Sequence, residues 1–446
     1  MRLSDLMAVG RAADHPVAYV EDRLIPWTEF QGRVARLTHA LIARPERTWL
    51  LTNCEPIDFA VALFAVWHAG RRALIPPSLR EGAIAAIQSQ ADGVLGGLGT
   101  WPTADAKPFP FAPLDPVRTG LDLYTSGSSG EPKRIRKRLD QLEAEVRILE
   151  RLWHDAKDGP VLATVPHHHI YGLLFRLLWP LAAGRPFDNT ACAAPEFLLD
   201  RLERLGPGRV VSSPSQLARM HDLIPLQRLA GRATQIFSSG GPLAASSAQH
   251  FREVLGEAPV EILGSTETGG IAWRIQDHDD AWTPFPDLCV SVSNEGALTL
   301  ISPMLPDTTP YLGDDAAELL EDGRFRLLGR LDRVVKIEEK RLSLPDMEAR
   351  LAAHPWVLEA ALVVLSGKRQ SLGALLTLSE AGRKALSEVG RTAFARALRQ
   401  YLSHWFDAVL LPRRWRYPAA LPYNERGKLA VADLARAFET TETRHD

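Results

Sequence analysis

The chain has 446 residues, of which 46% are hydrophobic and 24% charged, a composition that excludes a disordered or fibrous protein. Its 52 basic and 54 acidic residues give a formal net charge of −2, so nothing in the overall charge favours a nucleic-acid partner. Three widely separated cysteines, an N-terminus unlike a signal peptide and the lack of a bilayer-length apolar run together predict a cytoplasmic protein with no membrane span.

Helices and strands are predicted to alternate along the first part of the chain. Apolar residues at helical spacing predict a helix over 27–43, which is followed by a strand at 49–52 and a helix at 58–69. Further strands, several of which lead into Ser, Gly, Pro or His, are expected at 121–125, 161–165, 210–213, 235–238 and 260–264. We therefore expect an α/β fold with a largely parallel sheet, whose ligands bind beyond the carboxyl ends of the strands.

The character of the sequence changes near Asp332. Beyond it, strands are expected at 360–365 and 374–378, and helices at 380–388 and 391–408. We predict a large N-terminal multi-sheet α/β domain over 1–331 and a smaller C-terminal α+β domain over 332–446.

The segment YTSGSSGEPK, residues 124–133, carries the strongest chemical signal. Gly127 and Gly130 allow a ligand to approach the backbone closely, and the loop amides can form an anion-binding nest. Hydroxyl donors and a positive charge come from Thr125, Ser126, Ser128, Ser129 and Lys133. A polyphosphate requires these groups. A plain Gly/Ser turn accounts less well for the strand before the segment, the helix expected after it and the Pro-Lys pair at its end. The GxxxxGK[ST] motif of P-loop enzymes is absent.

This segment resembles the phosphate loop of the adenylate-forming superfamily, whose members include acyl- and aryl-CoA synthetases. Other motifs of that family have counterparts here in the same order, namely PHHHIYG at 166–172, SSGGPL at 238–243, GSTETG at 264–269, YLGDDAAEL at 311–319 and YNERGK at 423–428. The resemblance covers most of the chain and implies that the C-terminal domain is mobile. Within the family, the compact first domain is similar to ligases that accompany aryl-polyene or fatty-acid-like biosynthesis.

The resemblance implies a role for each matching residue. ATP is expected to contact the phosphate loop together with Ser239, Gly240, Gly241, Gly264, Asp314 and Arg330. Thr266 is implied to contact the α-phosphate, and Glu267 to hold Mg²⁺, a hard cation that prefers oxygen ligands. His169 corresponds to the substrate gate, Asp332 to the hinge and Lys428 to the catalytic lysine. A metal site made of the three consecutive histidines is not expected, because successive side chains do not easily reach one ion.

The chain departs from the family pattern at three places. Leu263 stands where the family usually has an aromatic residue beside the adenine, and Leu312 replaces a threonine. After the hinge, where the family has a glycine beside the path of the thiol acceptor, the chain reads Ile337-Glu338-Glu339-Lys340. The second half-reaction is therefore less firmly implied than the first.

The implied activity is ATP-dependent formation of an acyl adenylate with release of pyrophosphate, followed by transfer to a thiol. The acceptor is coenzyme A or the phosphopantetheine of an acyl carrier protein, and an aryl or medium-chain acid is favoured. The basic run 133–138 could meet the coenzyme's phosphate or an acidic carrier, or could simply be the solvated start of a helix.

Other functions are weighed against this one. A kinase or ATPase would need a Walker-type lysine, which is not apparent. A catalytically silent regulator would have been supported by loss of Glu267 or Lys428, but both are present. An adenylation-only or amine-loading ligase stays open.

Overall fold

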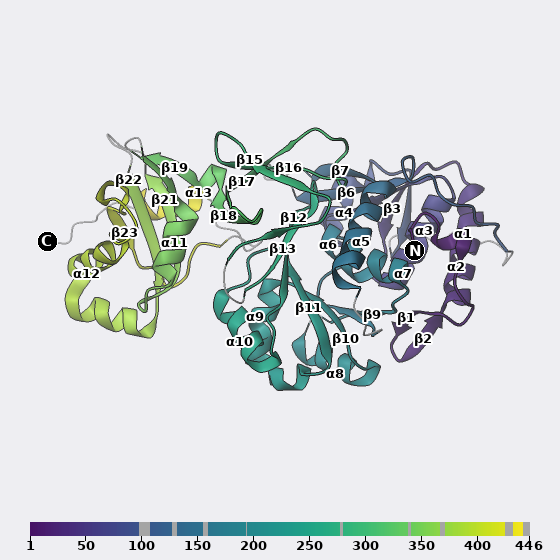
Figure 1. Ribbon diagram of the computed structural model, residues 1–446, viewed down its shortest axis with the longest axis horizontal. Helices are drawn as coiled ribbons and strands as arrows, with labels where there is room; N and C mark the ends of the chain where they lie inside the picture. The colour runs from purple at the N-terminus through teal and green to yellow at the C-terminus, as the bar shows by residue number, and fades with distance from the viewer. Residues whose placement is uncertain are drawn as a thin grey trace. The chain divides into compact units, whose positions relative to one another are not determined.

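The computed structural model describes residues 1–97, 108–126, 132–154, 159–192, 194–276, 280–337, 340–365, 371–423 and 431–439 (Figure 1). The chain divides into two compact units, one comprising 1–289 with 301–311 and the other 290–300 with 312–446. The predicted domain boundary between residues 331 and 332 falls inside the second unit. The role of Asp332 as the hinge stays a prediction.

The first unit contains two sheets. The nine-stranded sheet runs in the order β14 (Thr283–Pro284), β13 (Gly269–Ile275), β12 (Val260–Ser265), β11 (Ala233–Ser239), β10 (Gly208–Ser212), β8 (Val161–Ala163), β9 (Phe187–Ala191), β1 (Pro16–Val20) and β2 (Arg23–Pro26). The five-stranded sheet runs in the order β5 (Gly93–Gly96), β3 (Thr48–Thr52), β4 (Arg72–Ile75), β6 (Gly120–Ser126) and β7 (Pro132–Arg138).

Helices cover these sheets. They are α1 (Leu6–Val9), α2 (Trp27–Ile42), α3 (Pro56–His68), α4 (Glu81–Gln88), α5 (Leu139–Trp153), α6 (Ile170–Gly172), the π-helix η1 (Leu173–Leu178), α7 (Trp179–Ala183), α8 (Pro195–Leu205), α9 (Pro214–Leu223), the 3₁₀ turn η2 (Leu226–Leu229) and α10 (Ala245–Leu255). The helices predicted at 27–43 and 58–69 are confirmed as α2 and α3.

Side chains of the central strands enter two cores alternately, as the two-residue period of a strand requires. Val211 and Phe237 point into the large core that the two sheets share with α2, α3, α5 and α7. Their neighbours Val210 and Ile236 point into the core beneath α8, α9 and α10, on the other face of the sheet (Figure 1). Strands β8, β10, β11 and β12 are mutually parallel, so their carboxyl ends lie along one edge, as predicted.

One reading of the basic run 133–138 is wrong. The run is not the solvated start of a helix but forms strand β7, antiparallel to β6, and the helix expected after the phosphate loop begins at Leu139. Pairing with β6 places the cationic Arg136 opposite Asp122, which is fully buried and accepts hydrogen bonds from Arg72 and Arg134. This cross-strand charge pairing stabilises a strand whose sequence has no clear apolar alternation.

The second unit contains β15 (Cys289–Val292), β16 (Ala297–Ile301), β17 (Tyr311–Leu319) and β18 (Phe325–Arg330), then the 3₁₀ turn η3 (Leu331–Arg333), β19 (Val334–Ile337), β20 (Lys340–Ser343), α11 (Leu344–Ala352), β21 (Val357–Leu365), β22 (Ser371–Leu378), α12 (Glu380–Leu402), the 3₁₀ turn η4 (Ala408–Leu410), β23 (Arg414–Arg416) and α13 (Val431–Glu439). The break predicted between two helices is present at Gly390, whose φ of 73° interrupts α12. The mixed α/β class, with a large multi-sheet N-terminal part and a smaller C-terminal part, is confirmed. Within the described ranges, no helix combines the length and apolarity needed to cross a bilayer.

Candidate active site

The β6–β7 hairpin brackets the predicted phosphate loop. Thr125 and Ser126 are the last residues of β6, and Thr125 pairs with Lys133 on β7. Gly127, Ser128, Ser129 and Gly130 lie outside the described residues. The hairpin thus fixes both ends of the loop, and the predicted contacts of these residues with phosphate stay predictions.

Lys133 is brought to a second predicted site residue. Its Nζ donates to Oε1 of Glu267 at 2.7 Å. Burial by itself would raise the pKa of Glu267, but the hydrogen bond and charge of Lys133, together with hydrogen bonds within the turn, outweigh burial and lower that pKa. Glu267 is therefore an ionised, half-buried carboxylate that already faces a cation.

The turn that carries Thr266 and Glu267 connects β12 to β13. Gly264 and Gly270 face each other across this hairpin, where a Cβ on Gly264 would lie 2.5 Å from the carbonyl oxygen of Gly269. The chain can approach itself this closely only without a side chain. The spacing of GSTETG is thus explained by hairpin geometry, which presents Thr266 and Glu267 beyond the carboxyl end of β12.

Two buried charged residues beneath this turn were missed by the sequence analysis. Lys137 is 2% exposed and donates to the backbone carbonyl of Glu267 at 2.7 Å. Glu145 of α5 is 4% exposed and accepts from the amide of Gly270 at 2.8 Å. Burial lowers the pKa of Lys137 to about 8 and raises the pKa of Glu145 to about 7. One sequence signal could have identified Lys137: if residues 133–138 form a strand, Lys137 lies on the same face as Lys133.

The carboxyl end of β11 provides the next predicted contacts. Ser239 is buried and donates to the carbonyl of Ile262 on β12, which ties the two strand ends together. Gly240, with φ of 93°, and Gly241 both have open space where a Cβ would stand. A ligand can therefore approach this backbone closely, as the predicted contact with ATP requires.

The histidine segment follows β8. His167 is buried, its Nε2 lies 2.9 Å from the carbonyl of Asn53, and burial lowers its pKa to about 3. Burial also lowers the pKa of His168 to about 3. His169, the predicted gate, is exposed at the start of α6. His169 is therefore the most exposed of the three histidines.

A row of hydroxyl groups crosses the ends of three adjacent parallel strands. Thr164 follows β8, and its Oγ1 lies 2.9 Å from Oγ of Ser212 at the end of β10. Ser212 pairs in register with Ser238 of β11. Ser238 is 1% exposed, and its hydroxyl has no hydrogen-bond partner in the described part of the chain. A buried hydroxyl without a partner is suited to bind a polar group of a ligand.

The remaining predicted residues belong to the second unit. Asp314 of β17 and Arg330 of β18 form an exposed ion pair at 3.3 Å. Asp332 follows directly in η3. Lys428 and Glu339 lie outside the described residues. The predicted roles of Asp314, Arg330, Asp332 and Lys428 stay predictions.

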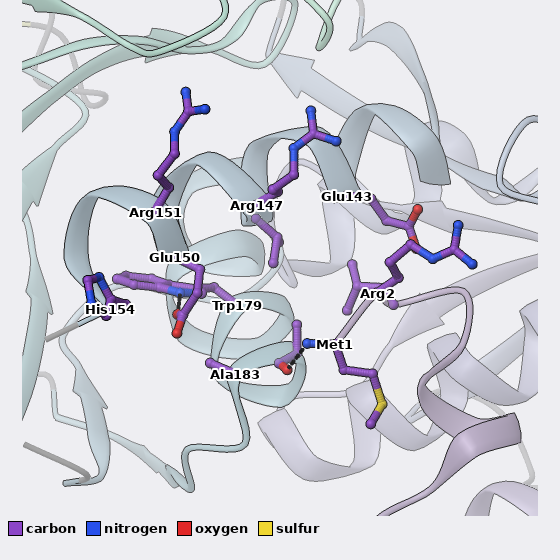
Figure 2. A pocket seen from close by; sticks show the side chains of 12 residues that line it. Met1, Arg2, Glu143, Arg147, Glu150, Arg151, His154, Trp179 and Ala183 are labelled. Carbon is purple, nitrogen blue, oxygen red and sulfur yellow. Dashed lines mark hydrogen bonds between the residues drawn. The ribbon is translucent and has the colours of Figure 1, made fainter. Parts of the chain in front are cut away.

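A cavity of about 700 Å³ lies elsewhere in the first unit. Figure 2 shows Trp179, Arg147 and the N-terminal Met1 among its lining residues. None of the predicted site residues lines this cavity, and two of its carboxylates already have partners, since Glu150 accepts from Trp179 and Glu143 from the amide of Ser4. The cavity is therefore separate from the candidate active site.

The Glu267 carboxylate is chemically suited to Mg²⁺. Its oxygens are hard donors, and the ammonium of Lys133 stands beside Oε1 as a cation. The described residues contain no group of three or more His, Cys, Asp or Glu side chains that could hold a metal by themselves.

Comparison with known proteins gives a consistent result. Residues 99–324 match the family model described as AMP-binding enzyme. The 4-coumarate–CoA ligase of Cereibacter sphaeroides is 30% identical over 316 residues, which cover 69% of each chain. The ATP-bound crystal structure of MatB from Rhodopseudomonas palustris has a TM-score of 0.79 at 19% identity and covers 98% of this chain and 99% of its own. The AMP complex of O-succinylbenzoate coenzyme A synthetase from Bacillus subtilis has a TM-score of 0.78 at 16% identity, with 97% of each chain covered.

Proposed function

This chain belongs to the AMP-binding enzyme family and is an AMP-forming acid–thiol ligase, and we propose that it joins an aromatic acid bearing a polar substituent to coenzyme A. The observation that carries the site assignment is the ion pair between Lys133 and Glu267, which brings together two residues that the sequence assigned to ATP phosphates and magnesium.

In the first step, the substrate carboxylate attacks the α-phosphorus of ATP, and pyrophosphate leaves. Positioning and charge stabilisation dominate this chemistry. Lys133 and the phosphate loop bind the β- and γ-phosphates, and Thr266 binds the α-phosphate. Glu267 would hold Mg²⁺, which would offset negative charge on the leaving group. Lys428 places its charge between the incoming carboxylate and the nucleotide.

The hydroxyl row Thr164, Ser212 and Ser238 supports an acid with a polar, uncharged substituent. His167 and His168 add no charge at neutral pH, because burial lowers the pKa of both to about 3. The buried cation beside these histidines, Arg176, already donates to the backbone carbonyls of Val165, Asp188 and Thr190, so it is committed to the protein backbone rather than to a second substrate carboxylate. A phenolic or other hydroxyl group on the substrate can instead form a hydrogen bond with the Ser238 hydroxyl, which has no partner among the described residues. The 4-coumarate–CoA ligases among the relatives support an aromatic acid.

Coenzyme A is the proposed acceptor, because 4-coumarate–CoA ligases and malonate–CoA ligases are among the similar curated proteins. Rotation of the C-terminal domain about Asp332 is proposed to withdraw Lys428 and admit the thiol. The missing glycine near Glu339 keeps an amine acceptor as the second candidate, and the fold is shared by the amide bond synthetase McbA from Marinactinospora thermotolerans, with a TM-score of 0.76 at 18% identity. All three cysteines are unpaired, which supports the predicted cytoplasmic location.

The test is ATP–pyrophosphate exchange across matched panels of aromatic, fatty and amino acids. The aromatic panel includes each acid with and without its hydroxyl group, and a dicarboxylic acid serves as the charged comparison. We expect the fastest exchange with a hydroxylated aromatic acid. Adding coenzyme A, carrier protein or an amine to the best acid then identifies the acceptor. Exchange confined to fatty or dicarboxylic acids would reject the proposed substrate class.

A further inference from the structure

Strand β7 contacts Glu267 at both its side chain and its backbone. Lys133 and Lys137 lie four residues apart on one face of the strand. Lys133 binds the Glu267 carboxylate, and Lys137 binds the Glu267 carbonyl, both at 2.7 Å. Lys137 also donates to the carbonyl of Met304 at 3.2 Å. One strand face therefore fixes the position of Glu267 relative to the phosphate loop.

The burial of Lys137 is unusual on physical grounds. An ammonium group loses its hydration when it is 2% exposed, and carbonyl oxygens replace only part of that hydration. A side chain that merely filled this space would be better apolar, because well-packed apolar groups often replace buried charges without loss of stability. Lys137 is thus placed at an energetic cost, in direct contact with the turn that carries Glu267.

Glu145 supports the same turn from α5. Its Oε1 accepts a hydrogen bond from the amide of Gly270, and a Cβ on Gly269 would lie only 2.5 Å from its Oε2. The hairpin backbone therefore packs directly against the Glu145 carboxylate. The positive charge of Lys137 favours the ionised form of Glu145. In so buried a place such hydrogen bonds are stronger than in water, and they resist small displacements of the turn.

We propose that Lys137 and Glu145 are positioning residues for adenylate formation, which hold the Glu267 turn from beneath so that its carboxylate meets the metal–nucleotide complex. This inference rests on the proposed role of Glu267 toward Mg²⁺. Neither residue touches ATP in the proposal. Both act through the backbone of the turn, where a shift of about 1 Å is enough to lower catalysis strongly.

The test uses Lys137→Met, which keeps the length of the side chain but removes its donor, and Glu145→Gln, which keeps an oxygen acceptor but removes the charge. Matched controls are Lys384→Met, at an exposed position on α12, and Glu143→Gln, two residues from Glu145 on the same helix. Calorimetry measures the Kd of an ATP analogue with a non-cleavable α,β-bridge, with and without Mg²⁺. Glu267→Gln is the reference variant.

We expect Lys137→Met to weaken binding in the presence of Mg²⁺ by about tenfold, the loss of one charge-assisted hydrogen bond, and to leave metal-free binding unchanged. Glu145→Gln should also weaken binding only in the presence of Mg²⁺, by a smaller factor. Both control variants should bind the analogue as the wild type does. Lys137→Gln, which restores an amide donor, should recover part of the loss. This partial recovery would separate a positioning role from a folding defect, as would an unchanged Tm without ligand.

The reference variant separates two kinds of failure. If Glu267→Gln leaves the Mg²⁺ dependence unchanged, the proposed role of Glu267 is wrong. If Glu267→Gln shifts that dependence but Lys137→Met does not, Lys137 is not a positioning residue. Equal loss of metal-free and metal-dependent binding in Lys137→Met would also overturn the inference, because it would show general distortion.

Discussion

Lys133 and Glu267 are 134 residues apart in sequence, yet Nζ of Lys133 lies 2.7 Å from Oε1 of Glu267. The contact joins the end of the phosphate-loop hairpin to the turn after β12. It places a cation and an anion, both assigned to the nucleotide from sequence, at one position in the first unit.

Replacing Lys133 tests the proposed phosphate contact. Lys133→Met removes a charge that binds anionic oxygen, so we expect kcat/KM for ATP to fall by about 10–100-fold. Steady-state pyrophosphate exchange at varied ATP measures this. Because the Lys133 side chain is 60% exposed, its ion pair adds little to stability, and Tm should change little. A large fall in Tm with normal exchange would contradict the phosphate assignment.

Lys428 is the predicted catalytic lysine. Lys428→Ala should abolish adenylate formation while ATP still binds, because the nucleotide contacts are assigned to other residues. Pyrophosphate exchange measures the first effect and calorimetry the second. Wild-type exchange in Lys428→Ala would remove this residue from the mechanism. Lys384→Ala, an exposed lysine on α12, serves as the control.

His167 should make the stability of the fold depend on pH. Burial lowers its pKa to about 3 in the folded protein, whereas an unperturbed histidine has a pKa of about 6.5. Between these values the unfolded state binds more protons, so the free energy of unfolding falls as pH drops from about 6.5 toward 3. The contribution of this residue to that slope is at most about 1.4 kcal/mol per pH unit.

Denaturant unfolding at several pH values measures this slope. His167→Gln keeps an amide donor for the Asn53 carbonyl but does not titrate, so its stability should depend less on pH in this range. His404→Gln, at an exposed position, should retain the wild-type slope. An identical slope in His167→Gln and wild type would show that His167 is not a buried neutral histidine.

Ser238 tests the polar substrate. Ser238→Ala removes a buried hydroxyl that lacks a partner in the described part of the chain. We expect the preference for a hydroxylated acid over its unsubstituted analogue to fall by about tenfold, with the unsubstituted acid little affected. The ratio of kcat/KM values for the two acids gives the answer. An equal fall in kcat/KM for both acids would show that Ser238 contributes to packing and not to recognition of the substrate hydroxyl group.

The sequence by itself determined the family and the central elements. Helical spacing predicts α2 because it buries one apolar face, and the apolar stretch of α3 predicts a helix buried on nearly all sides; both patterns are local. Motif order identifies the nucleotide residues because glycines, hydroxyls and a lysine at fixed offsets meet the demands of a phosphate group.

Only the tertiary structure decided what lies beneath the site. Lys137 is buried because carbonyls at Glu267 and Met304, 130 and 167 residues away, converge on its ammonium. No local pattern distinguishes it from its neighbours in the basic run, whose strand conformation depends on pairing with β6 and on Asp122. The hydroxyl row likewise requires that β8, β10 and β11 be adjacent. Contacts between distant segments create these features, and a sequence pattern records only what neighbouring residues do.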